Sequence, residues 1–263
     1  MILLMVLISL ITGGVINLIA DSLPVHREIL PPHCHACLAP RPPSAYLGLT
    51  AWLSGNRRCS YCGQSLRARH VLIELLLVAA GVWLQFSGVG LLALVPSFVV
   101  LSIFVLLTVT DIEHRLIPHA ISLPAIVLVA LLASLDPARG PERTLLGGLA
   151  GFGIVLLLYL FGEVYSRWQA KRRGEDLDEV AFGFGDVTLA TLIGVSVGWP
   201  AVILALMIGV LSAGAFSLLY ILWMVIRRQY QPHLPIPYGP FLIFGGLLVF
   251  FGGRQLFSSL LLN

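Results

Sequence analysis

The stretch Phe182-Gly-Phe-Gly-Asp186 opens an apolar segment that runs on to Trp199 and reads FGFGDVTLATLIGVSVGW. A carboxylate at the mouth of such a segment is costly to remove from water unless it has a partner or a chemical role. Gly183 and Gly185 remove side chains just before it, which would let another backbone, such as an extended substrate, approach closely. The stretch therefore predicts a membrane helix with a polar site at its entrance.

The composition of this 263-residue chain is that of a polytopic membrane protein. Hydrophobic residues make up 58% of it and charged residues 11%, and the mean hydropathy is +0.94. These values lie outside the range of soluble globular domains. The net charge is only +3, and the basic residues are scattered among loops, which argues against nucleic-acid binding. We therefore expect an all-α fold in contact with membrane lipid.

Apolar segments of spanning length recur along the chain. The first, at 1–20, lacks a positively charged start and a small residue at a cleavage position, so we expect a retained helix. Further candidate spans follow at 71–86, 89–110, 116–135, 145–165, 184–199, 201–226 and 238–256. The sequence thus predicts about eight transmembrane helices. It divides the chain into three parts, which are a first transmembrane helix at 1–20, an extramembrane module at 21–70 and a transmembrane domain at 71–263.

The basic residues indicate the orientation, because Lys and Arg of short loops stay preferentially in the cytoplasm. If the module is cytoplasmic, only Arg139, Arg143 and Arg254 of the 16 Lys and Arg residues lie outside. The same topology brings Asp111 and Asp186 to cytoplasmic helix ends. We therefore expect a multi-pass membrane protein with both acids at the cytoplasmic membrane face.

Asp111, which ends an apolar run, is the partner that we expect for Asp186. Two facing carboxylates that share one proton can hydrolyse a peptide bond, because the ionised one activates water while the protonated one polarises the carbonyl. In a simpler interpretation Asp111 caps a helix and Asp186 N-caps a helix that starts near Val187. A further alternative is a transporter in which the acids relay protons or bind a cation, although we find no internal repeat typical of transporters.

The four cysteines form two pairs, Cys34-His-Ala-Cys37 and Cys59-Ser-Tyr-Cys62, in the extramembrane module. Each Cys-x-x-Cys turn aims two thiolates at one point, and two such turns complete the tetrahedral sulfur site that suits zinc. Two disulfides or four free thiols are the alternatives, and a reducing cytoplasm argues against the disulfides. The module is too short and polar to bury a core, so we expect a structural zinc to supply much of its folding free energy. The neighbouring His33 and His35 could replace a cysteine as ligands.

Four motifs in this order resemble those of the type IV prepilin peptidases, which are Gly-x-Gly-Asp membrane aspartic proteases. The motifs are the two cysteine pairs, Asp111-Ile-Glu-His-Arg-Leu-Ile-Pro118, Gly183-Phe-Gly-Asp186 and Ile236-Pro-Tyr-Gly-Pro240. The resemblance covers nearly the whole chain and implies that Asp111 and Asp186 are the catalytic pair. It implies removal of a short basic leader from prepilins or pseudopilins at the cytoplasmic face of the bacterial inner membrane. In many members the new amino terminus is then methylated from S-adenosylmethionine.

The cysteine module is where the chain departs most from that family. Many members carry Gly-Arg/Lys-Cys before the third cysteine, whereas this chain reads Gly55-Asn-Arg-Arg-Cys59. Because the family assigns methylation to this region, the resemblance implies methylation less directly than cleavage. It places Arg58 and Glu74 near that second reaction, although a surface arginine and a helix-end carboxylate describe them equally well. Other interpretations are a Gly-x-Gly-Asp protease with different membrane substrates and a silent assembly factor that binds prepilins.

Overall fold

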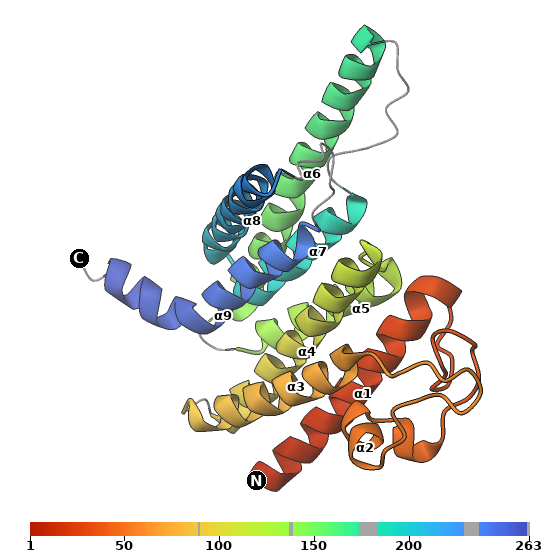
Figure 1. Ribbon diagram of the computed structural model, residues 1–263. Helices are drawn as coiled ribbons and strands as arrows, with labels where there is room; N and C mark the ends of the chain where they lie inside the picture. The colour runs from red at the N-terminus through yellow and green to blue at the C-terminus, as the bar shows by residue number, and fades with distance from the viewer. Residues whose placement is uncertain (89, 137–138, 174–182, 229–236, 262–263) are drawn as a thin grey trace. The chain divides into compact units, whose positions relative to one another are not determined.

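The computed structural model describes residues 1–88, 90–136, 139–173, 183–228 and 237–261. Phe182, Ile236 and residue 89, which belong to motifs or spans discussed above, lie outside these residues. The all-α prediction is confirmed for the described part of the chain. Its helices, shown in Figure 1, are α1 (Ile2–His26), a 3-10 turn at Pro43–Ala45, α2 (Gly48–Leu53), α3 (Ala68–Phe86), α4 (Leu91–His114), α5 (His119–Ser134), α6 (Gly140–Arg173), α7 (Phe184–Val197), α8 (Ala201–Ile226) and α9 (Gly239–Leu261).

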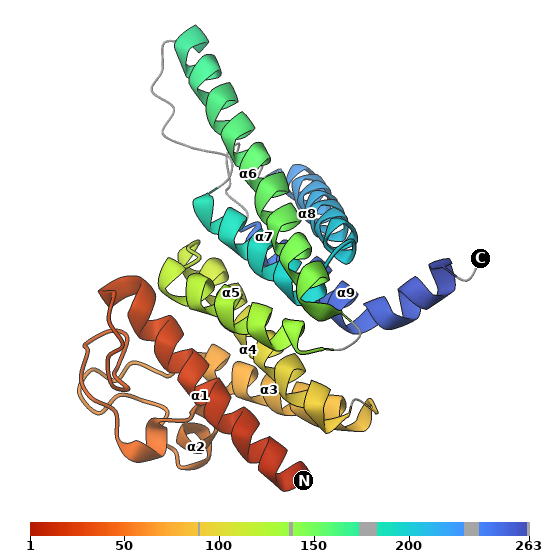
Figure 2. The same cartoon turned by 180° about the vertical axis from the view of Figure 1, so that it is seen from behind.

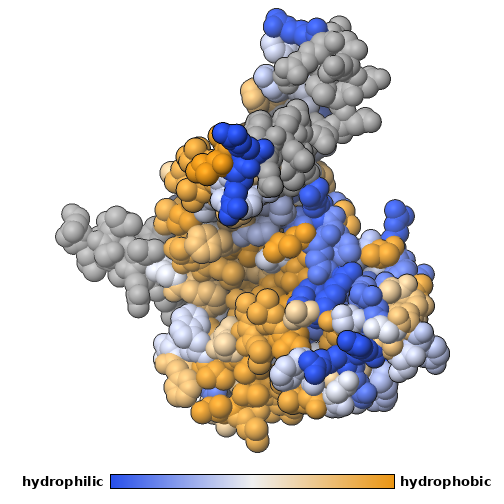
Figure 3. Space-filling view, viewed as in Figure 1, coloured by the Kyte–Doolittle hydropathy of each residue, from blue (hydrophilic) through white to orange (hydrophobic). Residues whose placement is uncertain are grey.

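Each predicted span corresponds to an apolar helix. Among the described residues, five helices have the length and composition to cross a membrane, at Ile2–His26, Ala68–Phe86, Leu92–His114, Gly140–Trp168 and Ala201–Ile226. Three shorter apolar helices lie at His119–Ser134, Phe184–Val197 and Gly239–Gly253. Hydrophobic side chains cover much of the surface over these helices (Figure 3). Large apolar side chains are exposed there because their surroundings in the cell are lipid.

Several helices extend beyond the predicted spans, and the longest extensions are at the ends of α1 and α6. Helix α1 continues past residue 20 to His26, where Arg27 adopts a left-handed conformation and donates its backbone N–H to the Leu23 carbonyl. Helix α6 continues past residue 165 to Arg173. Both extensions are polar, so the apolar runs alone underestimated the helix lengths.

The chain divides into two compact units, Met1–Thr110 and Asp111–Asn263. In the first unit, α1 packs on α3 through small residues. A Cβ at Gly13 would lie 2.8 Å from Glu74 Cγ, and a Cβ at Gly81 would lie 2.6 Å from Ser9 Oγ. The absence of side chains at these glycines therefore lets the two helices approach closely.

Helix α7, which carries the opening motif, lies at the centre of the second unit between α6 and α9 (Figure 2). Its residues 187–190 and 192–197 are buried. The contact with α6 is close, since a Cβ at Gly151 would lie only 2.3 Å from the Ala190 carbonyl oxygen. The apolar sequence of α7 thus reflects burial by protein on several sides.

Candidate functional site

Asp111 lies in the last turn of α4 and is only 7% exposed. Its Oδ2 accepts a hydrogen bond of 3.0 Å from the backbone N–H of Gly239, the first residue of α9. The first N–H groups of a helix lack partners within the helix and carry partial positive charge. Asp111 therefore binds the start of another helix and does not cap its own.

Gly239 is a site residue whose role the sequence analysis missed. A Cβ at this position would lie 2.5 Å from Asp111 Oδ2 and 3.0 Å from Asp111 Cγ, so any side chain would collide with the carboxylate. The available signal was a glycine flanked by Tyr238 and Pro240 at the start of an apolar run. That pattern indicates a helix start but does not predict that the Asp111 carboxylate would bind there.

Asp186 lies in the first turn of α7 and is half-buried. The helix begins at Phe184 with Gly183 as its N-cap, three residues earlier than the capping alternative expects. Asp186 nevertheless caps this helix start from its third position, because its Oδ2 accepts a hydrogen bond of 3.1 Å from the Gly183 backbone N–H. Asp186 is held, like Asp111, by one backbone donor.

The two acids occupy one region of the second unit although they are far apart in the sequence. A Cβ on Gly239, which holds Asp111, would lie 3.5 Å from Leu189 Cδ2, one turn after Asp186 in α7. A Cβ on Gly185, beside Asp186, would lie 3.0 Å from Ile117 Cβ, six residues after Asp111. In each acid the described hydrogen bond uses Oδ2, which leaves Oδ1 outside those bonds. Two neighbouring carboxyl groups, each with one oxygen that these bonds do not use, can share a proton and activate a water molecule.

The two glycines before Asp186 differ in their surroundings. Gly183 is exposed, and a Cβ there would come no closer than 3.8 Å to another residue's atoms. A Cβ at Gly185 would lie 3.0 Å from Ile117 Cβ, in the segment that joins α4 to α5. The space that Gly185 leaves is therefore filled by Ile117, and only Gly183 offers open backbone.

The four cysteines come together in the extramembrane module. Their Sγ atoms all lie within 4.8 Å of one another, and the Cys34–Cys62 and Cys37–Cys59 pairs are each 3.6 Å apart. Zinc–sulfur bonds of about 2.3 Å place the sulfurs of a tetrahedral site about 3.8 Å apart. The cysteines are free thiols at distances that fit a four-coordinate metal, so the disulfide alternative is not formed.

Both Cys-x-x-Cys turns have the same backbone. The N–H of Cys34 donates to the Ala39 carbonyl and that of Cys59 to the Gln64 carbonyl, each at 2.9 Å. The residue after the second cysteine is left-handed in both turns, with φ of 59° at Leu38 and 72° at Gly63. Backbone N–H groups of Cys62 and Tyr61 lower the pKa of Cys59 to about 6, which favours a thiolate ready to bind metal.

His33 and His35 are not part of this cluster. Among the described residues, the group of potential metal ligands consists of the four cysteines alone. His33 Nδ1 lies 2.9 Å from the Pro31 carbonyl oxygen, which indicates that it donates to that carbonyl. The prediction that a histidine could replace a cysteine therefore finds no support in the geometry.

Glu74 joins the extramembrane module to α3. Its carboxylate is fully buried and accepts hydrogen bonds from the backbone N–H groups of Gly48 at 2.6 Å and Leu49 at 2.8 Å. These donors lie at the start of α2. A buried carboxylate needs such partners, so the contact fixes α2 to α3. The sequence, which describes Glu74 as a helix-end carboxylate, does not reveal this bond.

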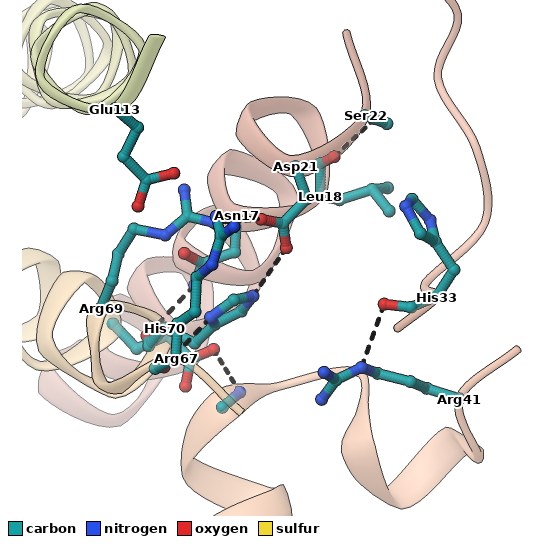
Figure 4. A network of polar contacts seen from close by, with 12 residues as sticks. Asn17, Leu18, Asp21, Ser22, His33, Arg41, Arg67, Arg69, His70 and Glu113 are labelled. Carbon is teal, nitrogen blue, oxygen red and sulfur yellow. Dashed lines mark hydrogen bonds and ion pairs between the residues drawn. The ribbon is translucent and has the colours of Figure 1, made fainter. Parts of the chain in front are cut away.

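A polar network surrounds Asp21 near the end of α1 (Figure 4). Asp21 pairs with Arg69, and its Oδ2 lies 2.8 Å from His70 Nε2. Asn17 Nδ2 donates to the His70 carbonyl at 3.1 Å, while Asn17 Oδ1 is buried without a hydrogen-bond partner. Asn17, Asp21 and His70 line a hollow together with His33 and other residues of the module. The hollow lies entirely within the first unit.

Comparisons with known proteins identify two matching regions. Residues 98–218 match the model of the type IV leader peptidase family, and residues 7–87 match that of the bacterial peptidase A24 N-terminal domain. Several relatives carry the name prepilin leader peptidase/N-methyltransferase, among them the following three. The protein of Dickeya chrysanthemi is 30% identical over 222 residues, which is 82% of this chain and 70% of the relative. That of Bacillus subtilis (strain 168) is 25% identical over 257 residues, covering 95% and 94%. That of Aeromonas salmonicida is 26% identical over 230 residues, covering 85% and 72%. No solved structure matches the chain.

Proposed function

Since this chain belongs to the type IV leader peptidase family, we propose that it removes the leader from prepilins and pseudopilins with Asp111 and Asp186 as its catalytic pair. Peptidase activity is the activity of the family. The observation that carries the residue assignment is that two acids far apart in the sequence are each held by a backbone N–H in the same unit, at the starts of α9 and α7, which pack on one another. The same observations favour a peptidase over the transporter alternative.

The proposed mechanism uses one ionised and one protonated carboxyl group. The ionised group accepts a proton from water, whose oxygen attacks the carbonyl carbon of the scissile peptide bond, while the protonated group donates a hydrogen bond to the carbonyl oxygen. A proton then passes to the leaving nitrogen as the carbon–nitrogen bond breaks. The N–H groups of Gly239 and Gly183 orient the two carboxyl groups by holding Oδ2 of each.

The apolar helices and the family membership make this a multi-pass inner-membrane protein. We assign the acids to the cytoplasmic side because the loop distribution of Lys and Arg favours that orientation. Helices α6 and α8 both end in basic residues, including Arg172 and Arg227. A substrate with an apolar helix behind its leader would keep that helix in the bilayer while the peptide bond reaches the acids.

The experiment compares cleavage of a leader-bearing prepilin by the wild type and by Asp111→Asn and Asp186→Asn variants in lipid vesicles. Each variant keeps the side-chain shape, so we expect intact folding and a loss of rate of about a thousandfold or more. Glu142→Gln, which neutralises an exposed acid in the first turn of α6, serves as the matched control. Cleavage at the wild-type rate by either aspartate variant would show that the pair is not catalytic.

We also propose that the four cysteines bind structural zinc. The sulfur distances and the paired turns support a tetrahedral site at Cys34, Cys37, Cys59 and Cys62. Zinc bound there would supply folding free energy to the module. Metal analysis of protein purified without chelators should return one zinc per chain, and a value near zero would contradict the proposal.

A second reaction, methylation of the new amino terminus from S-adenosylmethionine, is proposed because the relatives' names include N-methyltransferase. The hollow beside Asn17, within the region that matches the N-terminal domain, supports this proposal. The Oδ1 atom of Asn17 has no hydrogen-bond partner among the described residues, and an amine N–H of a bound molecule could donate to it. The test measures transfer of labelled methyl to cleaved pilin. Asn17→Ala should lose transfer while keeping cleavage, and unchanged transfer would exclude this hollow.

A further inference from the structure

Helices α6 and α8 carry the same four side chains at the same spacing. On α6 these are Phe161, Tyr165, Trp168 and Arg172, and on α8 they are Phe216, Tyr220, Trp223 and Arg227. Both sets follow the pattern Phe-x3-Tyr-x2-Trp-x3-Arg. We call each set an aromatic–arginine ladder. The sequence shows the spacing but does not show that the rings of each set contact one another.

Each ladder is continuous along one helix face. On α6 the ring centroids of Phe161 and Tyr165 are 6.5 Å apart, those of Tyr165 and Trp168 are 6.0 Å apart, and the Arg172 guanidinium lies 3.8 Å from the Trp168 ring. The corresponding distances on α8 are 6.1, 6.1 and 5.8 Å. Two independent helices thus present the same sequence of contacts.

Both ladders have exposed rings, although Phe216 of the α8 ladder also contacts Phe241 of α9. Trp168 is 49% exposed and Trp223 is 50% exposed, and Phe161 and Phe216 are also exposed. The described ion pair near the α6 ladder joins Glu163 to Arg167 and does not use Arg172. A guanidinium stacked on a ring keeps its edge N–H groups for an anion, and phosphate suits their geometry.

Polarity changes steadily along each ladder. A purely apolar ring comes first, two rings with a polar group follow, and a cation ends the series after about 16 Å of helix. One leaflet of a bilayer has the same order, with about 15 Å of hydrocarbon below the interface and phosphate above it. Tyr and Trp prefer that interface. The ladder therefore complements a phospholipid from acyl chain to phosphate.

The two ladders point toward the same membrane face. Helix α7 crosses back between α6 and α8 in the sequence, so α6 and α8 run in the same direction, and the two helices contact each other. Figure 3 shows hydrophilic side chains gathered at the ends of both helices, beyond the hydrophobic surface. The positions of the arginines and of the Tyr and Trp rings therefore indicate the same membrane interface for both helices.

We propose that each ladder binds an anionic phospholipid, with the phosphate at Arg172 or Arg227 and an acyl chain along the rings. The two bound lipids would set the depth of the second unit in the membrane. This proposal does not depend on the proposed peptidase activity.

The ladders also give a depth for the two acids. Phe184, in the same turn as Asp186, contacts Tyr159 with ring centroids 6.2 Å apart, and Tyr159 precedes Trp168 by about 13 Å of helix. Phe241, near Gly239, contacts Phe216 at 5.1 Å, and Phe216 precedes Trp223 by about 10 Å. Both measures put the acids about 10 to 13 Å below the interfacial tryptophans. If the acids are catalytic as proposed, the peptide bond is cut within the hydrocarbon layer.

The depth is tested with single-tryptophan proteins. The chain has five Trp residues, and two variants keep only Trp168 or only Trp223, with Phe at the others. In vesicles, lipids brominated near the headgroup should quench both tryptophans equally and more strongly than lipids brominated near the chain end. Depths that differ by more than about one helical turn, 5.4 Å, would overturn the proposal. So would a Trp168 that no brominated lipid quenches.

The lipid is tested by counting retained phosphatidylglycerol in native mass spectrometry. The Arg172→Gln/Arg227→Gln protein should lose affinity by about tenfold per arginine, because each substitution removes a charge-assisted hydrogen bond to phosphate. The matched control, Arg167→Gln/Arg228→Gln, removes the same charge from the same helix ends and should keep its affinity. Equal losses in both proteins would indicate general attraction to charge and overturn the proposal, as would no loss in the first. Phosphatidylcholine should bind both proteins equally.

Discussion

Replacing Gly239 by alanine tests whether the placement of Asp111 matters for catalysis. The new methyl group would lie 2.5 Å from Asp111 Oδ2, 3.0 Å from Cγ and 3.5 Å from Leu189 Cδ2. Ordinary contacts of this kind are at least about 3.4 Å, so the carboxyl group must move by about 1 Å. Because Asp111 is buried, this movement also lengthens its 3.0 Å hydrogen bond to the Gly239 N–H.

The expected cost is mainly catalytic. A displacement of about 1 Å in a catalytic group lowers the rate by about a hundredfold, and loss of one buried hydrogen bond costs about 1 to 3 kcal/mol of stability. Single-turnover cleavage of a prepilin in vesicles measures the rate, and thermal unfolding measures the stability. We expect Gly239→Ala to be about a hundredfold slower while it remains folded.

The control for this variant is Gly253→Ala on the same helix. Among the described residues, a Cβ there would meet only Val249 Cγ1, at an ordinary 3.7 Å, so the rate should stay at the wild-type value. Cleavage by Gly239→Ala within about threefold of the wild type, with unchanged unfolding temperature, would refute the reasoning. It would mean that Asp111 tolerates the shift or does not act in the reaction.

Three further substitutions test other contacts. Leu38→Gly should stabilise the cysteine module by about 1 kcal/mol, because glycine adopts the left-handed φ of 59° without strain, and chelator-induced unfolding would measure it. A less stable module would contradict the shared turn geometry. Glu74→Gln should lower the free energy of unfolding by about 1 to 3 kcal/mol, because the new NH2 group would face a backbone N–H of α2. An unchanged unfolding temperature would mean that the hydrogen bonds of Glu74 do not hold α2 to α3. Gly151→Ala should reduce the folded fraction in detergent, because its Cβ would lie 2.3 Å from the Ala190 carbonyl oxygen, and a normal yield would mean that α6 and α7 can separate.

The positions of the apolar helices could be predicted because apolar length is a local property of the sequence. Their ends could not, because contacts with distant residues decide them. The charge of Asp21 is a reason to end the first span at residue 20, yet Arg69 and His70 neutralise that charge and α1 continues. The polar residues after 165 likewise led to a predicted span that ends before the last turns of α6.

The candidate site shows a similar division. Asp111, Asp186 and the cysteines could be chosen from the sequence because charged and thiol side chains are rare in such a chain and their spacing is informative. Gly239 could not, because its role depends on one carboxylate that another helix brings beside it. The space at Gly185 is likewise explained only by the position of Ile117.

The shortness of α7 has a consequence for the supply of water. A helix of 14 residues is about 21 Å long, whereas the oily layer of a bilayer measures about 30 Å. A segment this short cannot reach both surfaces of the layer, so we expect the bilayer to thin around it. Thinning would bring solvent nearer to the first turn of α7, where Asp186 lies, and would shorten the path by which the reagent for hydrolysis reaches the acid.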